Sequence, residues 1–348
     1  MVDALSEVHL LDVGQGDCLV AIDGATREAV VIDCPDLAAA DKVVRLLQTA
    51  NVQLTAAVIT HWDTDHYGGI VEIARRISPR SLYYNHDTLV PAPGERKNRI
   101  RSALLNILNL PDAERILHPL KAGDQFQIGQ IEVRCFAPTH FEISTAHARG
   151  QRNVASAVTM LEVNGTRVLT GADATGAIWQ RLLDEQTDLT ATYFRWPHHG
   201  AHIHGDITSS IASRVLETVS PGFVFVSAGA RNNHGHPDWD VIQLLRGAGV
   251  RVLCSQVTPG CLGYRDRADR MSPAGRAQLD LLNGQHACAG DVSLMIDTRG
   301  TVAMTPSETT HLARLADLSA PMCQASVEAS AAELTPAPKT EGPPAQHL

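Results

Sequence analysis

Four side chains that can bind a metal ion are crowded into six residues, directly behind an apolar segment that predicts a buried strand at 54–60. They are His61, Asp63, Asp65 and His66. At the carboxyl end of a strand, a loop lets side chains at positions i, i+2, i+4 and i+5 converge, which a straight strand or helix does not permit. Burying two carboxylates and two imidazoles without a counter-charge would cost on the order of several kcal/mol. The segment therefore predicts bound metal ions.

Short apolar runs alternate with amphipathic segments along most of the chain, which is typical of an α/β protein. The expected strands are 8–13, 18–22, 29–33, 54–60, 82–85, 131–137, 157–163, 167–170, 222–227, 250–254 and 292–297, with one more leading up to Pro197. The expected helices are 36–50, with Asp36 as its cap, 68–77, 100–110, 177–186, 209–219 and 238–248.

Two segments repeat the same order of elements. CLVAIDGATREAVVIDCPD at 18–36 and AVTMLEVNGTRVLTGADAT at 157–175 both read as strand, glycine-containing turn and strand. Each second strand ends next to an aspartate, Asp33 in the first segment and Asp173 in the second. The repeat predicts two similar αβ halves.

The overall charge limits the classes of partner. A net charge of -9 and a pI near 5.9 argue against binding of nucleic acid or membrane by the whole surface. Bound metal ions can still provide local positive charge for an anionic substrate. No signal-peptide pattern and no apolar run of membrane-spanning length are recognisable, so we expect a cytoplasmic protein with no membrane contact.

The cysteines and the end of the chain carry weaker signals. The seven cysteines form no CxxC pair, and we expect buried free thiols in a reducing compartment. From 306 the composition becomes rich in Ala, Pro, Thr and Glu. We therefore expect a hydrolase domain at 1–305 and a low-complexity, largely disordered tail at 306–348, with a short helix near 311–318 able to dock.

The motif His-x-Asp-x-Asp-His, followed by Gly68-Gly69, resembles the signature of the metallo-β-lactamase superfamily, in its variant with Asp at the second position. The segments LLDVGQGDCLVAIDG, PHHG and SAGARNNHGHP are similar to the metallo-hydrolase domain of competence-type DNA-uptake (ComEC) proteins. The resemblance covers roughly residues 6–300. It implies an α/β (α+β) fold, the four-layer αββα sandwich, with two divalent metal ions at one edge.

By this resemblance, His61 and Asp63 hold one metal ion, and Asp65 and His66 hold the other. Asp173 matches the bridging carboxylate, although it could also cap the helix that follows. The last ligand is His198 or His199. Alignment from Pro197 favours His199 and alignment from Gly200 favours His198, so the choice stays open.

Further residues match positions around the metal ions. Asp33 resembles the aspartate that orients a ligand histidine, with a turn-capping role before Pro35 as the alternative. His236 matches a histidine beside the substrate, where it would contact the substrate or donate a proton, and otherwise it is a loop histidine. His234 is a weaker partner for it, and Arg231 is a candidate for holding further phosphates.

One family position departs from the common pattern. Many members carry another ligand histidine before the bridging aspartate, and His140 and His147 are available there. The DNA-uptake pattern instead matches Asn153 and Ser156. With Asp63 in place of histidine, such a site would shift preference from zinc toward manganese, so either metal is expected.

The stretch 139–152 precedes this position and contains Arg149 and Arg152. It is either a lid over the site or an ordinary flexible insertion. Arg195 is a further basic residue expected near the mouth of the site.

These residues together predict a two-metal hydrolase. Two cations about 3.5–4 Å apart would share a hydroxide that attacks phosphorus or a carbonyl carbon. Asp63 or Asp65 would orient it, and His236 would protonate the departing oxygen. The leading function is a phosphodiesterase or nuclease acting on nucleic acid or another phosphodiester. The alternatives are a small-molecule esterase or lactonase, and an effector subunit of a bacterial defence system that a protein partner regulates.

Overall fold

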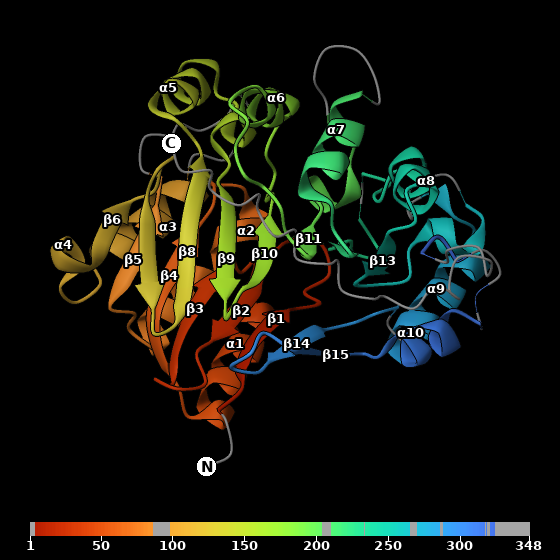
Figure 1. Cartoon of the computed structure of the whole chain (residues 1–348), viewed down its shortest axis with the longest axis horizontal. Helices are drawn as coiled ribbons and strands as arrows, with labels where there is room; N and C mark the ends of the chain where they lie inside the picture. The colour runs from red at the N-terminus through yellow and green to blue at the C-terminus, as the bar shows by residue number, and fades with distance from the viewer. Residues whose placement is uncertain are drawn as a thin grey trace, which may run out of the picture.

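The strands form two mixed sheets that lie face to face (Figure 1). The computed structural model describes residues 4–85, 98–203, 210–232, 234–264, 270–285, 288–316, 318 and 321–323. In Figure 1, β8, β9 and β10 lie in front of β3, β4 and β5, and helices cover the outer faces. This arrangement is the αββα sandwich, so the fold prediction is confirmed.

The first sheet has eight strands among the described residues, in the order β15-β14-β1-β2-β3-β4-β5-β6. Their bounds are β1 Ser6–Leu10, β2 Leu19–Ile22, β3 Glu28–Ile32, β4 Gln53–Ile59, β5 Ser81–Tyr84, β6 Leu117–Pro119, β14 Val292–Ile296 and β15 Val302–Thr305. The second sheet has seven described strands, in the order β13-β12-β11-β10-β9-β8-β7. These are β7 Gln125–Ile128, β8 Ile131–Ala137, β9 Val158–Val163, β10 Thr166–Thr170, β11 Tyr193–Arg195, β12 Phe223–Val226 and β13 Arg251–Cys254.

Each sheet has helices packed on its outer face. Beside the first sheet lie α1 Leu37–Ala50, α2 Thr64–Arg76, α3 Asn98–Leu108 and α4 Ala113–Ile116. Beside the second sheet lie α6 Gly176–Asp184, α7 Ser210–Val219, α8 Trp239–Gly247, α9 Pro273–Gln285 and α10 Glu308–Leu315. The part of the chain that the structure describes also contains α5 His140–Arg149 and short 3-10 helices at Arg152–Ala155, His198–Gly200 and Pro259–Leu262.

The strands are apolar on both faces because both faces are covered. In β2, Leu19 and Ala21 face the core between the sheets, whereas Val20 and Ile22 face the helices of the first sheet. All four are fully buried. Strands covered on two sides appear in a sequence as continuous apolar runs, which explains the pattern at 18–22 and 29–33.

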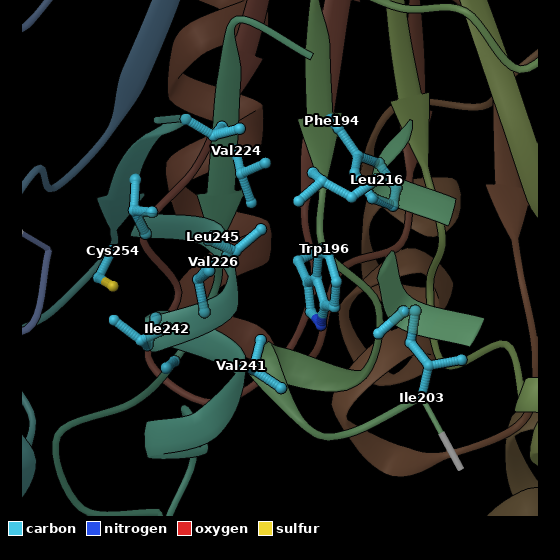
Figure 2. Close-up of a cluster of buried hydrophobic side chains, with 14 of the residues drawn as sticks. Phe194, Trp196, Ile203, Leu216, Val224, Val226, Val241, Ile242, Leu245 and Cys254 are labelled. Atoms are coloured by element: carbon cyan, nitrogen blue, oxygen red, sulfur yellow. The ribbon is translucent and has the colours of Figure 1, made fainter. Parts of the chain in front are cut away.

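A second apolar layer lies between the other sheet and its helices (Figure 2). Phe194 and Trp196 come from β11 and the residue after it, and Leu216 comes from α7. The strands β12 and β13 contribute Val224, Val226 and Cys254, and α8 contributes Val241, Ile242 and Leu245. This layer fixes β11, the strand that leads to His198 and His199.

Most predicted elements are present with ends shifted by a few residues, and one shift matters for the site. The cap of α1 is confirmed, because the Asp36 carboxylate accepts a hydrogen bond from the Ala39 N–H at 2.9 Å. Helix α2 begins at Thr64 rather than at 68, so the prediction of a loop through the whole metal-binding segment was wrong. Asp63 stands at the N-cap position without a side-chain capping hydrogen bond, and Asp65 lies in the first turn.

Helix α2 can begin this early because Gly68 and Gly69 pack directly on the chain after β3. A Cβ atom at Gly68 would lie 2.3 Å from the carbonyl oxygen of Pro35, and one at Gly69 would lie 2.4 Å from Cys34 Sγ. The two glycines therefore bring the first turn of α2 close to the end of β3, as their position in the sequence suggests.

The two repeated segments form equivalent hairpins. Strands β2 and β3 pair antiparallel, and β3 then pairs parallel with β4. Strands β9 and β10 pair antiparallel, and β10 then pairs parallel with β11. Asp33 and Asp173 follow the second strand of each hairpin, so the predicted αβ halves are present.

Two other segments can be compared with expectation. The stretch 139–152 contains α5, with a capping box between Thr139 and Glu142, and its role as a lid or an ordinary insertion stays a prediction. Glu142 also pairs with Arg181 of α6 at 2.8 Å. At the end of the chain, packing continues beyond 305, since α10 is present and Met322 and Cys323 are buried. Residues from 324 onward lie outside the described part, so the predicted tail stays a prediction.

No helix among the described residues combines the length and the apolar character needed to cross a lipid bilayer.

Candidate metal centre

The carboxyl ends of strands from both sheets bring the predicted ligands together. His61 follows β4 of the first sheet, and Asp173 follows β10 of the second. His66 belongs to the first turns of α2, and His199 follows β11. These four side chains are buried, with exposed fractions of 3% or less.

Two groups of potential metal-ligand atoms face the two oxygens of Asp173. In the first group, Asp173 Oδ2 lies 3.6 Å from His61 Nε2 and 3.7 Å from His198 Nε2. Asp63 Oδ2 completes this group at 3.5 Å from His61 Nε2.

In the second group, Asp173 Oδ1 lies 3.3 Å from His66 Nε2 and 3.7 Å from His199 Nε2. Asp65 Oδ2 lies 3.3 Å from His199 Nε2. Asp173 therefore stands between the groups, the position expected of a bridging carboxylate.

Four buried atoms of these groups have no hydrogen-bond partner in the described structure: His61 Nε2, His66 Nε2, His199 Nε2 and Asp173 Oδ1. Leaving one such atom unsatisfied costs about 1–3 kcal/mol. Imidazole nitrogens and carboxylate oxygens are the ligands that zinc and manganese take in proteins. The residues thus fit a centre of two divalent ions.

The ionised carboxylates of the centre also favour the binding of cations. Burial lowers the pKa of His61, but the carboxylates of Asp173 and Asp63 outweigh it and raise this pKa to about 9. Burial raises the pKa of Asp173, and the neighbouring imidazoles of His66 and His199 lower it to well below its usual range. Ionised carboxylates here attract either protons or metal ions, and metal binding would displace the protons.

Asp33 lies behind the second group, on the far side of His66 from Asp173. Its Oδ2 accepts a hydrogen bond from His66 Nδ1 at 2.7 Å. Its two oxygens also accept from the N–H and hydroxyl of Thr60, at 2.8 and 2.6 Å. With the proton held on Nδ1, the lone pair of His66 Nε2 points toward Asp173.

Both candidate histidines after β11 reach the centre, one in each group. His199 is buried, and its Nδ1 donates to the carbonyl oxygen of Ser227 at 3.0 Å, which leaves Nε2 for the second group. His198 is more exposed and joins the first group. Both residues have a positive φ, 51° and 56°, so the chain turns sharply here and the two side chains separate.

Ser156 contacts the ligands, whereas the described residues include no hydrogen bond between Asn153 and a ligand. The Ser156 hydroxyl accepts from the Asp173 N–H at 2.9 Å and lies 3.3 Å from His61 Nδ1. It touches the nitrogen of His61 that faces away from Asp173, so it positions this histidine instead of replacing a ligand. His140 and His147 are exposed on α5.

Asp17 is a residue of the centre that the sequence analysis missed. Its Oδ1 lies 3.5 Å from His199 Nδ1 and 2.8 Å from Arg195 Nη2. Arg195 is 2% exposed, so the expectation that it lies at the mouth was wrong. The signal was available in Gly14-Gln15-Gly16-Asp17, since a polar residue follows a glycine turn at the end of β1.

His236 approaches the first group from a separate loop. Its ring lies 5.8 Å from that of His198 and stacks on His234 at 5.7 Å. The buried Asn232 shapes this loop, because its Oδ1 accepts from the N–H groups of His234, Gly235 and His236 at 2.8–3.2 Å. Asn232 was also missed, although it lies inside the motif that carried the resemblance.

The predicted arginines have different surroundings. Arg152 Nη2 lies 2.6 Å from Asp63 Oδ1, at a shallow pocket of about 400 Å³. Arg231 is largely exposed and pairs with Asp280 on the surface, so no described contact links it to the centre. The structure therefore supports Arg152, and not Arg231, as the cation beside the ligands.

Comparisons with known proteins agree with the fold. The family described as the metallo-beta-lactamase superfamily matches residues 11–212. ComE operon protein 3 of Bacillus subtilis (strain 168) is 24% identical over 277 residues, covering 74% of this chain and 33% of that protein. The chain thus spans about a third of the length of this curated relative.

Two solved structures show a similar arrangement at low identity. One is Igni18, described as a novel metallo hydrolase from Ignicoccus hospitalis KIN4/I, with a TM-score of 0.44 and 17% identity over 71% of this chain and 94% of that one. The other is the metallo-beta-lactamase fold protein YhfI from Bacillus subtilis, with a TM-score of 0.43 and 12% identity over 70% and 94%.

Proposed function

The chain belongs to the metallo-β-lactamase superfamily, and we propose that it is a hydrolase that uses two divalent metal ions, zinc or manganese, to cleave phosphodiesters. The observation that carries this proposal is Asp173, whose two oxygens face two groups of buried donor atoms. A carboxylate in this place would hold two ions close enough to act on one substrate.

Each metal ion would have its own set of ligands. His61, Asp63 and His198 would hold the first ion, and Asp65, His66 and His199 the second, with Asp173 shared. When bound, such ions act as Lewis acids on a phosphoryl oxygen and lower the pKa of water toward neutrality.

The residues of the chain would position the water and the substrate. The side chains of Asp63 and Asp65 are 25% and 30% exposed, so both can meet an entering water molecule. Asp65 can accept a hydrogen bond from the attacking water with the oxygen that does not face His199, whereas Asp63 Oδ1 already pairs with Arg152. Arg152, next to Asp63, adds a positive charge on the side where an anionic substrate would enter.

His236 is the candidate for the proton that the leaving oxygen requires. Its Nδ1 lies 3.4 Å from Asp238 Oδ1, and its side chain is 14% exposed. This approach is not a hydrogen bond in the structure, but Asp238 lies close enough to orient the imidazole from the Nδ1 side, which would leave Nε2 for the substrate. The 5.8 Å between the rings of His236 and His198 places this group beside the first set of ligands.

Two observations favour a phosphodiester as substrate. Three aspartates at the centre suit hard metal ions that bind phosphate oxygens. The sequence motifs also resemble the metallo-hydrolase domain of DNA-uptake proteins, so nucleic acid is the expected polymer. The acidic surface makes binding depend on the centre and Arg152 rather than on the protein's overall charge.

The test is turnover of four substrates by the purified chain with Mn²⁺ or Zn²⁺: single-stranded DNA, plasmid, bis-(p-nitrophenyl) phosphate and a lactone. We expect phosphodiester cleavage that is lost in Asp65→Ala and kept in Asp36→Asn. The second variant is a matched control, because Asp36 caps α1 and Asn caps a helix equally well. Turnover of the lactone alone would reject the phosphodiester and favour the esterase.

A further inference from the structure

A second cluster of potential metal ligands is formed by Cys254, Cys288, His311 and Cys323. Cys254 ends β13, Cys288 precedes β14, His311 belongs to α10, and Cys323 follows that helix. All four side chains are buried, with exposed fractions from 1% to 5%. All four also lie outside residues 11–212, the part of the chain that the family matches.

Three of the ligand atoms form a compact group. The sulfur atoms of Cys288 and Cys323 lie 3.8 Å apart, and Cys288 Sγ lies 3.3 Å from His311 Nε2. These three atoms all lie within 4.8 Å of one another. Cys254 Sγ lies 2.9 Å from Cys323 Sγ, but it is not one of the three atoms that all lie within 4.8 Å of one another.

Two of these three spacings are close to the edges of a tetrahedral zinc site. With Zn–S bonds of about 2.3 Å, two sulfurs of one tetrahedron lie roughly 3.8 Å apart, and a sulfur and an imidazole nitrogen about 3.6 Å. The pairs of Cys288 with Cys323 and His311 lie close to these values. The pair of Cys254 and Cys323 is closer than such an edge and much longer than a disulfide bond of about 2.05 Å.

We propose that Cys254, Cys288, His311 and Cys323 bind a structural zinc ion, separate from the carboxylate-rich centre. Three thiolates and one imidazole form a closed set of four ligands, which selects a thiophilic ion and leaves no position for a substrate. The ion would satisfy the buried imidazole, which otherwise has a weak thiol as its partner.

The site would join segments that are far apart in the sequence. It connects the end of β13 in the second sheet with the start of β14 in the first, and it anchors α10 and the segment at 321–323 on them. Figure 1 shows α10 and α9 on the side of the molecule where β13 lies, and Figure 2 shows Cys254 at the margin of the apolar layer. Arg314 of α10 supports this junction by donating to the carbonyl oxygens of Cys288 and Ala289.

The anchored segment also forms one wall of the pocket next to His236. Met322, the neighbour of Cys323, lines this pocket of about 300 Å³ together with His236, Trp239 and Tyr264. Met322 packs so closely on the opposite wall that a Cβ atom at Gly260 would lie 2.1 Å from its sulfur. The zinc ion would therefore fix the shape of a pocket beside the proposed proton donor.

The test begins with the full chain, purified under reducing conditions with zinc and then loaded with Co²⁺. Elemental analysis should find one metal ion beyond those of the carboxylate centre. The cobalt form should show a thiolate-to-metal charge-transfer band from the cysteine site. The carboxylate centre cannot produce this band, because it has no sulfur ligand. Cys288→Ser and Cys323→Ser should lose this ion and the band. Cys135→Ser should keep both, since Cys135 is a buried thiol that contacts the carbonyl oxygen of Ala137 instead.

A wild-type measurement decides the question if the serine variants fail to fold. X-ray absorption at the zinc edge should detect sulfur neighbours at about 2.3 Å. A spectrum with only nitrogen and oxygen neighbours would overturn the proposal. A disulfide between Cys254 and Cys323 in the chain purified under reducing conditions would also overturn it. The outcome is separate from catalysis, because Asp65→Ala should abolish turnover and leave the charge-transfer band unchanged.

Discussion

Substituting Asp33 by asparagine tests how the centre holds its second metal ion. Asp33 is 1% exposed, and its oxygens accept three hydrogen bonds from Thr60 and His66. Asparagine has nearly the same shape, but it has one acceptor oxygen and one NH₂ group. If the oxygen stays opposite the Thr60 N–H, the NH₂ group faces His66 Nδ1.

This exchange would reverse the tautomer of His66. Nδ1 must then accept a hydrogen bond, so the proton moves to Nε2, which lies 3.3 Å from Asp173 Oδ1 and loses the lone pair that binds the metal. Loss of an orienting carboxylate behind a ligand histidine weakens metal binding about 10- to 100-fold. This corresponds to about 1.4–2.8 kcal/mol. The unfolding free energy should also fall, by about 1–3 kcal/mol, because the Thr60 hydroxyl loses the carboxylate oxygen that accepts its hydrogen bond.

The assay is competition with a chromophoric chelator, with thermal unfolding measured in parallel on the metal-free chain. We expect one of the two ions of Asp33→Asn to bind more weakly and the other to bind as in the wild type. Asp36→Asn serves as the control, since it removes the same charge three residues away without touching the centre. Two ions bound to Asp33→Asn with wild-type affinity would refute the tautomer argument.

Three further predictions concern the ligands and the residues that position them. His199→Ala should lose the second ion almost entirely, because the buried Nε2 of His199 faces Asp65. His198 is more exposed, so His198→Ala should only weaken binding of the first ion. Titration of each variant with Mn²⁺ will distinguish the two effects. Ser156→Ala should lower the unfolding free energy by about 1–3 kcal/mol, since the Asp173 N–H loses its acceptor, and denaturant unfolding that matches the wild type would contradict this. Asn232→Ala should lower kcat about tenfold or more and leave the metal content unchanged, because the loop that carries His236 loses three hydrogen bonds to Asn232 Oδ1. Steady-state kinetics will measure kcat, and elemental analysis will measure the metal content.

The residues of the centre that lie within one segment could be predicted from the sequence. His61 to His66 follow a buried strand, and the glycine pair after them marks a close approach of the chain. Their chemistry and local order identify them without a structure. The start of α2 at Thr64 was not predicted, because Asp63 and Thr64 could equally belong to a loop and the packing against Pro35 is a tertiary contact.

Residues whose role depends on the direction of a side chain could not be assigned in this way. His198 and His199 are adjacent, and only the left-handed backbone at both positions turns one to each group. Ser156 and Asn153 were equivalent candidates until the fold brought the Ser156 hydroxyl against Asp173. Sequence alone gives the residue type at such positions and not the nitrogen or oxygen that it presents.

The cysteine cluster could not be recognised from the sequence. Its four ligands come from four segments, and the spacing between Cys254 and Cys288 spans α9 and a long connection. Short ligand spacings such as CxxC signal a metal site because they close a small loop, and here no such loop exists. The prediction of buried free thiols is confirmed for all seven cysteines. The contacts at 3.8 Å and 3.3 Å add that Cys288, Cys323 and His311 lie together.

The repeated hairpins explain why the carboxylate centre is built around His66. The first hairpin ends at Asp33, which accepts the proton on Nδ1 of this imidazole at 2.7 Å. The second hairpin ends at Asp173, which faces Nε2 of the same ring at 3.3 Å. Equivalent positions in the two halves therefore place a carboxylate on each side of one imidazole. Only one nitrogen of a neutral imidazole carries a proton. In His66 this nitrogen is Nδ1, and it donates to the aspartate that also accepts hydrogen bonds from other groups. Asp33, with Thr60 bound to both oxygens, orients the ring, and Asp173 is left with an oxygen that only a cation satisfies.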